Sequence, residues 1–83
     1  MLKKGDMSVM KTMQIKIRGI TDAAMFVEYA NEQIGDIIVK KGKFCVDGKS
    51  ILGILSLDMT SGATVEYPED ATNFENFIKK FKV

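Results

Sequence analysis

Segments with strand-like and helix-like spacing of apolar residues alternate along this chain of 83 residues, and this alternation limits the fold more than any other feature. Between Lys11 and Ile17 the apolar residues stand at every second position, which is typical of a half-buried strand. A reversal at Gly42-Lys43 joins two further strand-like segments into a hairpin. Four segments are expected to be strands: 11–17, 36–41, 44–47 and 63–67.

Three other segments carry apolar residues at helical spacing. Short polar side chains are favoured helix caps, so we expect Thr21 or Asp22 to begin the first helix and Asp70 the third. The second helix is expected at 50–57, and Gly35 is expected to end the first. The predicted order is βαββαβα, an α+β fold with a four-stranded antiparallel sheet and three helices on one face. The apolar residues expected to face the core are Ala23, Phe26, Val27, Ala30 and Ile34 in the first helix and Phe74, Phe77, Ile78 and Phe81 in the last.

The chain is expected to form one small domain. Residues 1–10 show no clear period and are interpreted as an N-terminal extension or a frayed start, whereas residues 11–83 are expected to be a single domain. A domain of this size buries only about 60–65% of its unfolded surface. Little room is left for an internal cavity, which favours a protein that acts through its surface.

The chain contains no histidine and one cysteine, Cys45. Catalysis by imidazole is therefore excluded, and a structural zinc site lacks its roughly four ligands. We expect no metal, no cofactor and no enzyme activity. A single cysteine cannot form an internal disulfide, which fits the reducing cytoplasm. Cys45 itself is expected to be a small core residue.

The charge balance gives no reason to expect nucleic acid or a membrane as partner. Twelve basic and eleven acidic residues leave a formal net charge of +1. No apolar run approaches the ~18 residues needed to span a bilayer. Four lysines near the predicted hairpin lack the interleaved aromatic residues that would stack on bases, and they are interpreted as a solvated face: Lys40, Lys41, Lys43 and Lys49.

One segment resembles a known family. It reads Lys49-Ser50-Ile51-Leu52-Gly53-Ile54-Leu55-Ser56-Leu57, and Gly62-Ala63 follows. This run is similar to the regulatory segment of the histidine-containing phosphocarrier proteins (HPr) of the bacterial sugar phosphotransferase system, and Ala24-Met25-Phe26-Val27 is similar to their first helix. The resemblance implies an HPr-like open-faced β-sandwich with the same βαββαβα order. It also implies a cytoplasmic protein associated with control of that system.

The resemblance further implies where a phosphoryl acceptor would lie. HPr proteins carry Gly-(Ile/Leu)-His-x-Arg-Pro-Ala before the first helix, and the histidine accepts phosphate from Enzyme I. Here the stretch reads Gly19-Ile20-Thr21-Asp22, a degenerate acceptor loop in which Thr21 or Gly19, depending on register, replaces the histidine. A phosphothreonine ester is a far poorer phosphoryl donor than phosphohistidine, and Asp22 would repel an incoming dianion. No phosphohistidine relay is expected.

Ser50 matches the serine that an ATP-dependent kinase/phosphorylase modifies in Gram-positive members of the family. A phosphate at this position would meet the positive end of the helix dipole, and Lys49 would add an opposite charge. Ser50 is therefore a candidate phosphorylation site. The alternative, left open, is that Ser50 only caps the helix.

The helix expected at 50–57 is more apolar than one buried stripe requires. If Ile54 and Leu57 face the sheet, the other aliphatic side chains cannot all be covered, and an exposed aliphatic patch usually marks a protein contact surface. By resemblance this face binds a Ser kinase/phosphorylase, a transcriptional regulator or a permease domain. The expected partner-binding residues are Lys49, Ile51, Leu52 and Leu55.

Two functional hypotheses follow. The first is a regulatory partner-binding protein without a phosphohistidine relay, switched at Ser50, as the resemblance to catabolite-repression HPr-like proteins implies. The second is a small structural or assembly protein that uses the HPr fold and homodimerises through its aliphatic patch.

Overall fold

The computed structural model describes residues 9–83, and its elements follow the predicted order βαββαβα with two short 3₁₀ helices added. Residues 1–8 of the expected N-terminal extension lie outside the described residues, and the first strand begins at Met10. The elements are β1 (Met10–Ile15), α1 (Ile20–Asn31), β2 (Ile38–Lys41), β3 (Phe44–Asp47), α2 (Ile51–Ser56), η2 (Met59–Ser61), β4 (Ala63–Pro68), α3 (Thr72–Ile78) and η3 (Lys79–Phe81).

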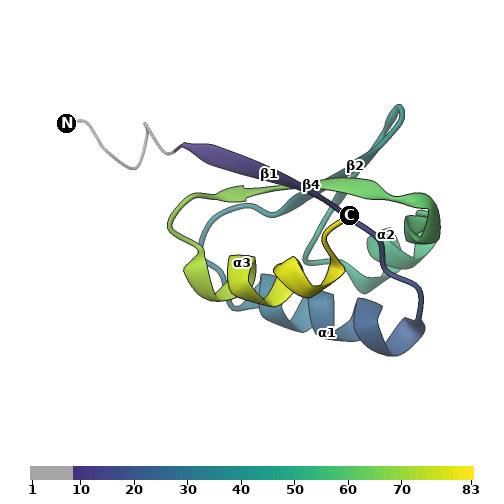
Figure 1. The fold of residues 1–83 in the computed structure, drawn as a ribbon, viewed down its shortest axis with the longest axis horizontal. Coiled ribbons are helices and arrows are strands. Elements are labelled where there is room, and N and C mark those ends of the chain that lie inside the picture. Colours follow the sequence, from purple (N-terminus) through teal and green to yellow (C-terminus); the bar gives the residue numbers. More distant parts are fainter. Residues whose placement is uncertain (1–8) are drawn as a thin grey trace.

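The four strands form one antiparallel sheet in the order β1-β4-β2-β3. All three α-helices lie on the same side of this sheet, so the other side is open (Figure 1). Strand β4 lies inside the sheet, because it has a strand on each side. It pairs with β1 along its full length and with β2 over residues 64–66. The predicted fold, an open-faced sandwich of one sheet and one helical layer, is confirmed.

The core lies between the sheet and the helices. Phe26 of α1 meets Phe74 of α3 edge to face, with ring centroids 5.4 Å apart. Tyr29 stacks on Phe77 at a centroid distance of 4.0 Å. These two contacts join α1 to α3 on the helical side. The fully buried large side chains of the core are Ile15, Phe26, Ile37, Val39, Ile54, Val65, Tyr67, Phe74 and Ile78.

The expected ends of the first helix are wrong. Gly19, with extended φ and ψ of −135° and 159°, is the last residue before α1, so Thr21 and Asp22 lie inside the first turn and neither caps it. At the other end α1 stops at Asn31, whose amide donates to the carbonyls of Val27 and Lys49. The amide of Asn31 thus links the end of α1 to the segment before α2.

Two residues expected to belong to the first helix have other roles. Ile34 lies beyond α1 and is fully exposed, so it is not part of the buried stripe. Gly35 does not end the helix either. A Cβ at Gly35 would lie 2.6 Å from the Cγ atom of Pro68, so the glycine allows the α1–β2 connection to pass close to the end of β4.

The cap expected for the last helix is also wrong. Ala71, not Asp70, precedes α3, because the chain turns after Pro68 with a hydrogen bond from the Ala71 N–H to the Pro68 carbonyl. Asp70 is exposed and makes no cap. Phe81 lies in η3 and is only partly buried against the core.

Two further corrections concern the strands. Strand β1 ends at Ile15 and β2 begins at Ile38, so Ile17 and Ile37 are buried from flanking segments outside the strands. Cys45 is exposed rather than buried. Its neighbour Val46 points toward α2, and side chains alternate along a strand, so Cys45 points to the open face of the sheet.

Candidate functional site

The start of α2 is built by a tight turn after β3. The Asp47 carboxylate accepts a hydrogen bond from the Lys49 N–H at 2.9 Å, and the Asp47 carbonyl accepts one from the Ser50 N–H at 3.0 Å. Ser50 is the N-cap of α2, and its hydroxyl oxygen accepts from the Gly53 N–H at 3.1 Å. The predicted role of Ser50 as a helix cap is confirmed, and its side chain is partly exposed.

Lys49 ties this turn to the end of α1. Its ammonium group donates to the Gln33 carbonyl at 2.8 Å, and its own carbonyl accepts from the Asn31 amide at 3.0 Å. The Lys49 ammonium group is therefore already hydrogen-bonded within the fold. Lys49 therefore holds the start of α2 close to the end of α1. That Lys49 also contacts a partner protein remains a prediction.

Helix α2 exposes most of its aliphatic side chains. Ile54 is buried and Leu57 packs against the core, as predicted, whereas the exposed fractions of Ile51, Leu52 and Leu55 are 37%, 78% and 48%. Gly53 lets this short helix lie close to β3, because a Cβ there would be 3.2 Å from the Val46 Cβ. We call the three exposed residues Ile51, Leu52 and Leu55 the α2 aliphatic face.

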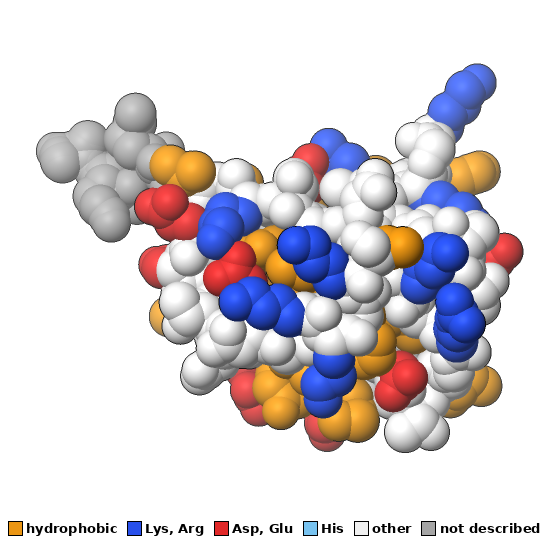
Figure 2. All heavy atoms as spheres, viewed as in Figure 1, with side chains coloured by type: hydrophobic (Ala, Val, Ile, Leu, Met, Phe, Trp, Pro, Cys, Tyr) orange, Lys and Arg blue, Asp and Glu red, His pale blue; other side chains and the backbone are white. Residues whose placement is uncertain are grey.

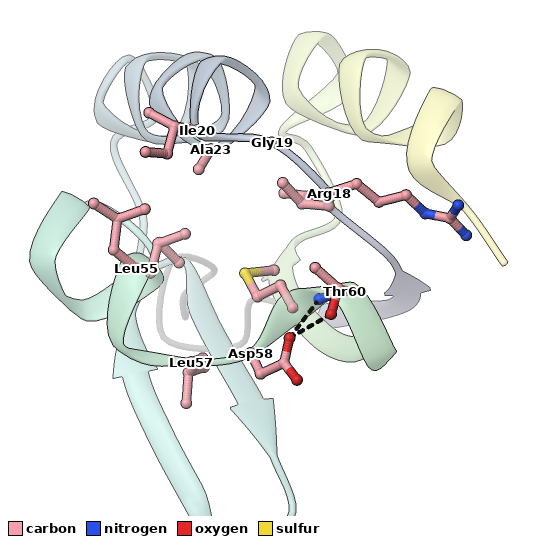
Figure 3. A pocket seen from close by; sticks show the side chains of 11 residues that line it. Arg18, Gly19, Ile20, Ala23, Leu55, Leu57, Asp58 and Thr60 are labelled. Atoms are coloured by element: carbon pink, nitrogen blue, oxygen red, sulfur yellow. Dashed lines mark hydrogen bonds between the residues drawn. The ribbon is translucent and has the colours of Figure 1, made fainter.

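A hollow of about 160 Å³ lies between the start of α1 and the α2–η2 segment (Figure 3). Gly19 and Ile20 border it on one side, and Leu55 borders it on the other. Figure 3 shows the Arg18 side chain pointing away from this hollow. The hollow is thus mainly apolar, and the fold brings one residue of the α2 aliphatic face next to the degenerate acceptor loop.

The polar rim of this hollow is a short capping motif. Asp58 accepts hydrogen bonds from the Thr60 N–H, at 3.2 Å, and from the Thr60 hydroxyl group. The Lys41 ammonium lies 3.8 Å from the other Asp58 carboxylate oxygen and donates to the Asp58 carbonyl. The hydrogen bonds from Thr60, followed by the charge of Lys41, hold the pKa of Asp58 below its ordinary value. Asp58 therefore stabilises the start of η2 as a carboxylate.

The structure joins only some of the predicted site residues. Gly19, Ile20 and Leu55 share the hollow, whereas Ser50 lies at the opposite end of α2 from Leu55. Thr21 is exposed on α1, and Asp22 faces a different hollow near the chain end. Asp58 and Thr60 were not predicted; the spacing Asp-x-Thr before a turn is the signal that could have identified them.

No group of three His, Cys, Asp or Glu side chains within residues 9–83 is placed to bind a metal ion. None of the helices described in that range has the length and apolar character required to cross a bilayer. The α1–α2 face carries aliphatic side chains, hydroxyl groups and one paired carboxylate. Such an arrangement is suited to contact with another protein surface.

Comparisons with known proteins agree with this fold. A family model described as "PTS HPr component phosphorylation site" matches residues 20–81. The HPr-like protein Crh of Halalkalibacterium halodurans is 42% identical over 43 residues, which are 52% of this chain and 51% of the relative. This match thus spans about half the length of that relative.

Two solved structures are similar over most of the chain. The phosphocarrier protein HPr of Bacillus anthracis superposes with a TM-score of 0.70 at 31% identity, covering 92% of this chain and 99% of that one. HPr-C-His of Thermoanaerobacter tengcongensis has a TM-score of 0.69 at 29% identity, covering 87% and 92%. Because the family match covers α1 to η3 and the topology agrees with the solved structures, the chain belongs to the HPr family.

Proposed function

We propose that this HPr-family chain is a regulatory partner-binding protein that has no phosphohistidine relay and is switched by phosphorylation of Ser50. One observation carries the proposal: a chain of 83 residues without histidine exposes the α2 aliphatic face directly after Ser50. A phosphoester on a hydroxyl group is too stable to pass its phosphate on readily, so docking is the function that the remaining groups support.

The α2 aliphatic face supports the docking part of the proposal. Leu52 is 78% exposed and Leu55 48%, and such neighbouring aliphatic side chains contribute to binding when a partner covers them. Lys49 and the Asn31 amide hold α2 against α1, so the face is presented on a fixed scaffold. We expect the partner to be a protein of the phosphotransferase system and the site of action to be the cytoplasm.

The position of Ser50 supports the switch. Its hydroxyl group caps α2 directly beside the aliphatic face, and a phosphate would add a charge of about −1.5 to −2 there. The Gly53 N–H that now donates to the hydroxyl oxygen can donate to a phosphate oxygen instead. Phosphorylation would thus change the charge of the docking surface without removing the cap.

The first test measures phosphate incorporation from ATP in the presence of an HPr kinase/phosphorylase. We expect the wild-type chain to incorporate about one phosphate, Ser50→Ala none, and Ser56→Ala as much as wild type. Ser56 is the matched control because it lies in the same helix and its hydroxyl group donates to the Gly53 carbonyl at 2.7 Å. Loss of the Ser50 cap costs about 1 kcal/mol, so circular dichroism must show that Ser50→Ala stays folded.

A second measurement tests the absence of a relay. Enzyme I and phosphoenolpyruvate are expected to leave the chain unlabelled, and an acid-labile phosphate that passes to a permease domain would contradict the proposal. Equal labelling of wild type and Ser50→Ala by the kinase would also contradict it. The assembly hypothesis replaces the regulatory proposal if two results are obtained together. Neither donor labels the chain, and Leu52→Asp converts a dimer to a monomer whereas the exposed control Ile34→Asp does not.

A further inference from the structure

A second hollow, of about 360 Å³, lies on the other side of the chain segment that leads into α1. Four basic residues from two distant parts of the sequence surround it, together with the aromatic ring of Phe81. The acidic side chain that lines this hollow is that of Asp22. Figure 2 shows several Lys and Arg side chains on the face that carries the C-terminal segment. We call the four residues the basic cluster: Lys16, Arg18, Lys80 and Lys82.

Backbone hydrogen bonds hold the two parts of the basic cluster together. The Lys16 N–H donates to the Phe81 carbonyl at 3.0 Å, and the Val83 N–H donates to the Gln14 carbonyl at 3.0 Å. Ile15 and Lys82 also form an isolated β-bridge. The backbone around the hollow is therefore fixed, and only the long side chains need to be ordered when a ligand binds.

The basic cluster differs from three other surface lysines in its partners. Lys11, Lys40 and Lys41 each form an ion pair with an acidic side chain, at 2.6, 2.7 and 3.8 Å. Within residues 9–83, no member of the basic cluster forms an ion pair, and Lys80 instead lies over the Phe77 ring at 5.1 Å from its centroid. Positive side chains thus outnumber the one acidic side chain at this hollow, although the net charge of the chain is only +1.

We propose that the basic cluster binds a small soluble molecule that carries two or more phosphate groups. Four cations against the Asp22 carboxylate leave a surplus of three positive charges. One phosphate group, of about −1.5 to −2, falls short of this surplus, whereas two phosphate groups neutralise it. Guanidinium and ammonium groups form strong charge-assisted hydrogen bonds with phosphate oxygens. A concave hollow lined by cationic side chains suits a compact anion better than an extended or flat one.

The test is a titration of the full chain with inorganic pyrophosphate at physiological ionic strength, followed by amide chemical shifts in NMR. We expect saturable binding, with the largest shifts at Lys16, Arg18 and residues 80–83. The double variant Arg18→Gln/Lys80→Gln should weaken the affinity roughly tenfold. The control variant Lys40→Gln/Lys43→Gln removes the same charge from the sheet and hairpin, and should change the affinity less than about twofold.

Three results would overturn the inference. Equal weakening in the two double variants would mean that pyrophosphate responds only to net charge. Shifts that do not saturate, or that centre on α1 and α2, would place the anion elsewhere. Sedimentation with phosphatidylglycerol vesicles, without any response to pyrophosphate, would assign the basic cluster to a membrane surface instead. None of these measurements involves Ser50, so the outcome is independent of the proposed function.

Discussion

At Gly48 two segments of the chain approach each other closely. Its N–H donates to the Ile37 carbonyl at 2.7 Å, and a Cβ at this position would lie 2.5 Å from the Ile37 Cγ2 atom and 3.0 Å from the same carbonyl. Ile37 is fully buried, so its branched side chain has no free space to move into. The turn that presents Ser50 therefore depends on a glycine two residues before it.

We expect Gly48→Ala to destabilise the protein by about 1–3 kcal/mol, the usual cost of an added methyl group in a packed region. The free energy of unfolding, measured by urea denaturation, checks this. Gly19→Ala is the matched control, because no atom lies within 4 Å of a Cβ at Gly19 and its φ of −135° suits any residue. Equal stability of Gly48→Ala and Gly19→Ala would contradict the close approach.

At the scale of elements, a polar group of three side chains joins β1, β4 and α3. The Tyr67 hydroxyl donates to the Glu75 carboxylate at 2.6 Å, and the Lys11 ammonium contacts the same oxygen at 2.6 Å. The hydrogen bonds from Lys11 and Tyr67 hold the pKa of Glu75 below its ordinary value. Burial, followed by the hydrogen bond to Glu75, raises the pKa of Tyr67. The edge strand β1 is thereby fastened to α3 through an ionised glutamate.

This arrangement predicts how stability depends on pH. The folded-state pKa of Glu75 is lower than in the unfolded chain, so its contribution is present above the ordinary glutamate pKa of about 4.3 and is lost as pH falls through the folded-state value. The free energy of unfolding of the wild type is expected to fall between neutral and acid pH. We expect this fall to be smaller in Glu75→Gln. Glu28→Gln, an exposed change on α1, should leave that fall unchanged, and equal pH profiles for the two variants would contradict the prediction.

At the scale of the whole molecule, one ring connects the two layers. Phe74 meets Phe26 of α1 at 5.4 Å and Tyr67 of β4 at 5.9 Å between centroids, in both cases edge to face. It is fully buried, whereas Phe44 lies in the β2–β3 hairpin, which points away from the helical layer in Figure 1, and is 69% exposed. Phe74 thus joins α3 both to α1 and to β4.

We expect Phe74→Ala to cost about 3–5 kcal/mol, a large part of the roughly 5–15 kcal/mol that stabilises a small domain. Phe44→Ala makes the same chemical change at the surface and should alter the unfolding free energy by no more than about 0.5 kcal/mol. Thermal unfolding followed by circular dichroism compares the two. A similar melting temperature for both variants would show that the layers are joined elsewhere.

Sequence patterns predicted the elements well and their ends poorly. The strand β3, the cap at Ser50 and the exposure of Leu52 follow from local spacing and composition, and each is confirmed. Helix ends depend on where the chain turns in space, so the caps expected at Thr21 or Asp22 and at Asp70 are wrong. The roles of Ser50 and of the α2 aliphatic face in binding and phosphorylation remain predictions.

The sequence by itself determined the order of strands and helices, the family and the absence of an imidazole group, because these depend on residue types and their spacing. Only the tertiary structure decided which distant groups meet. The bonds of Lys49 to the end of α1, the network at Glu75 and the basic cluster all join residues that are far apart along the chain. Such contacts depend on how the layers pack, and packing is a property of the whole chain rather than of any local segment.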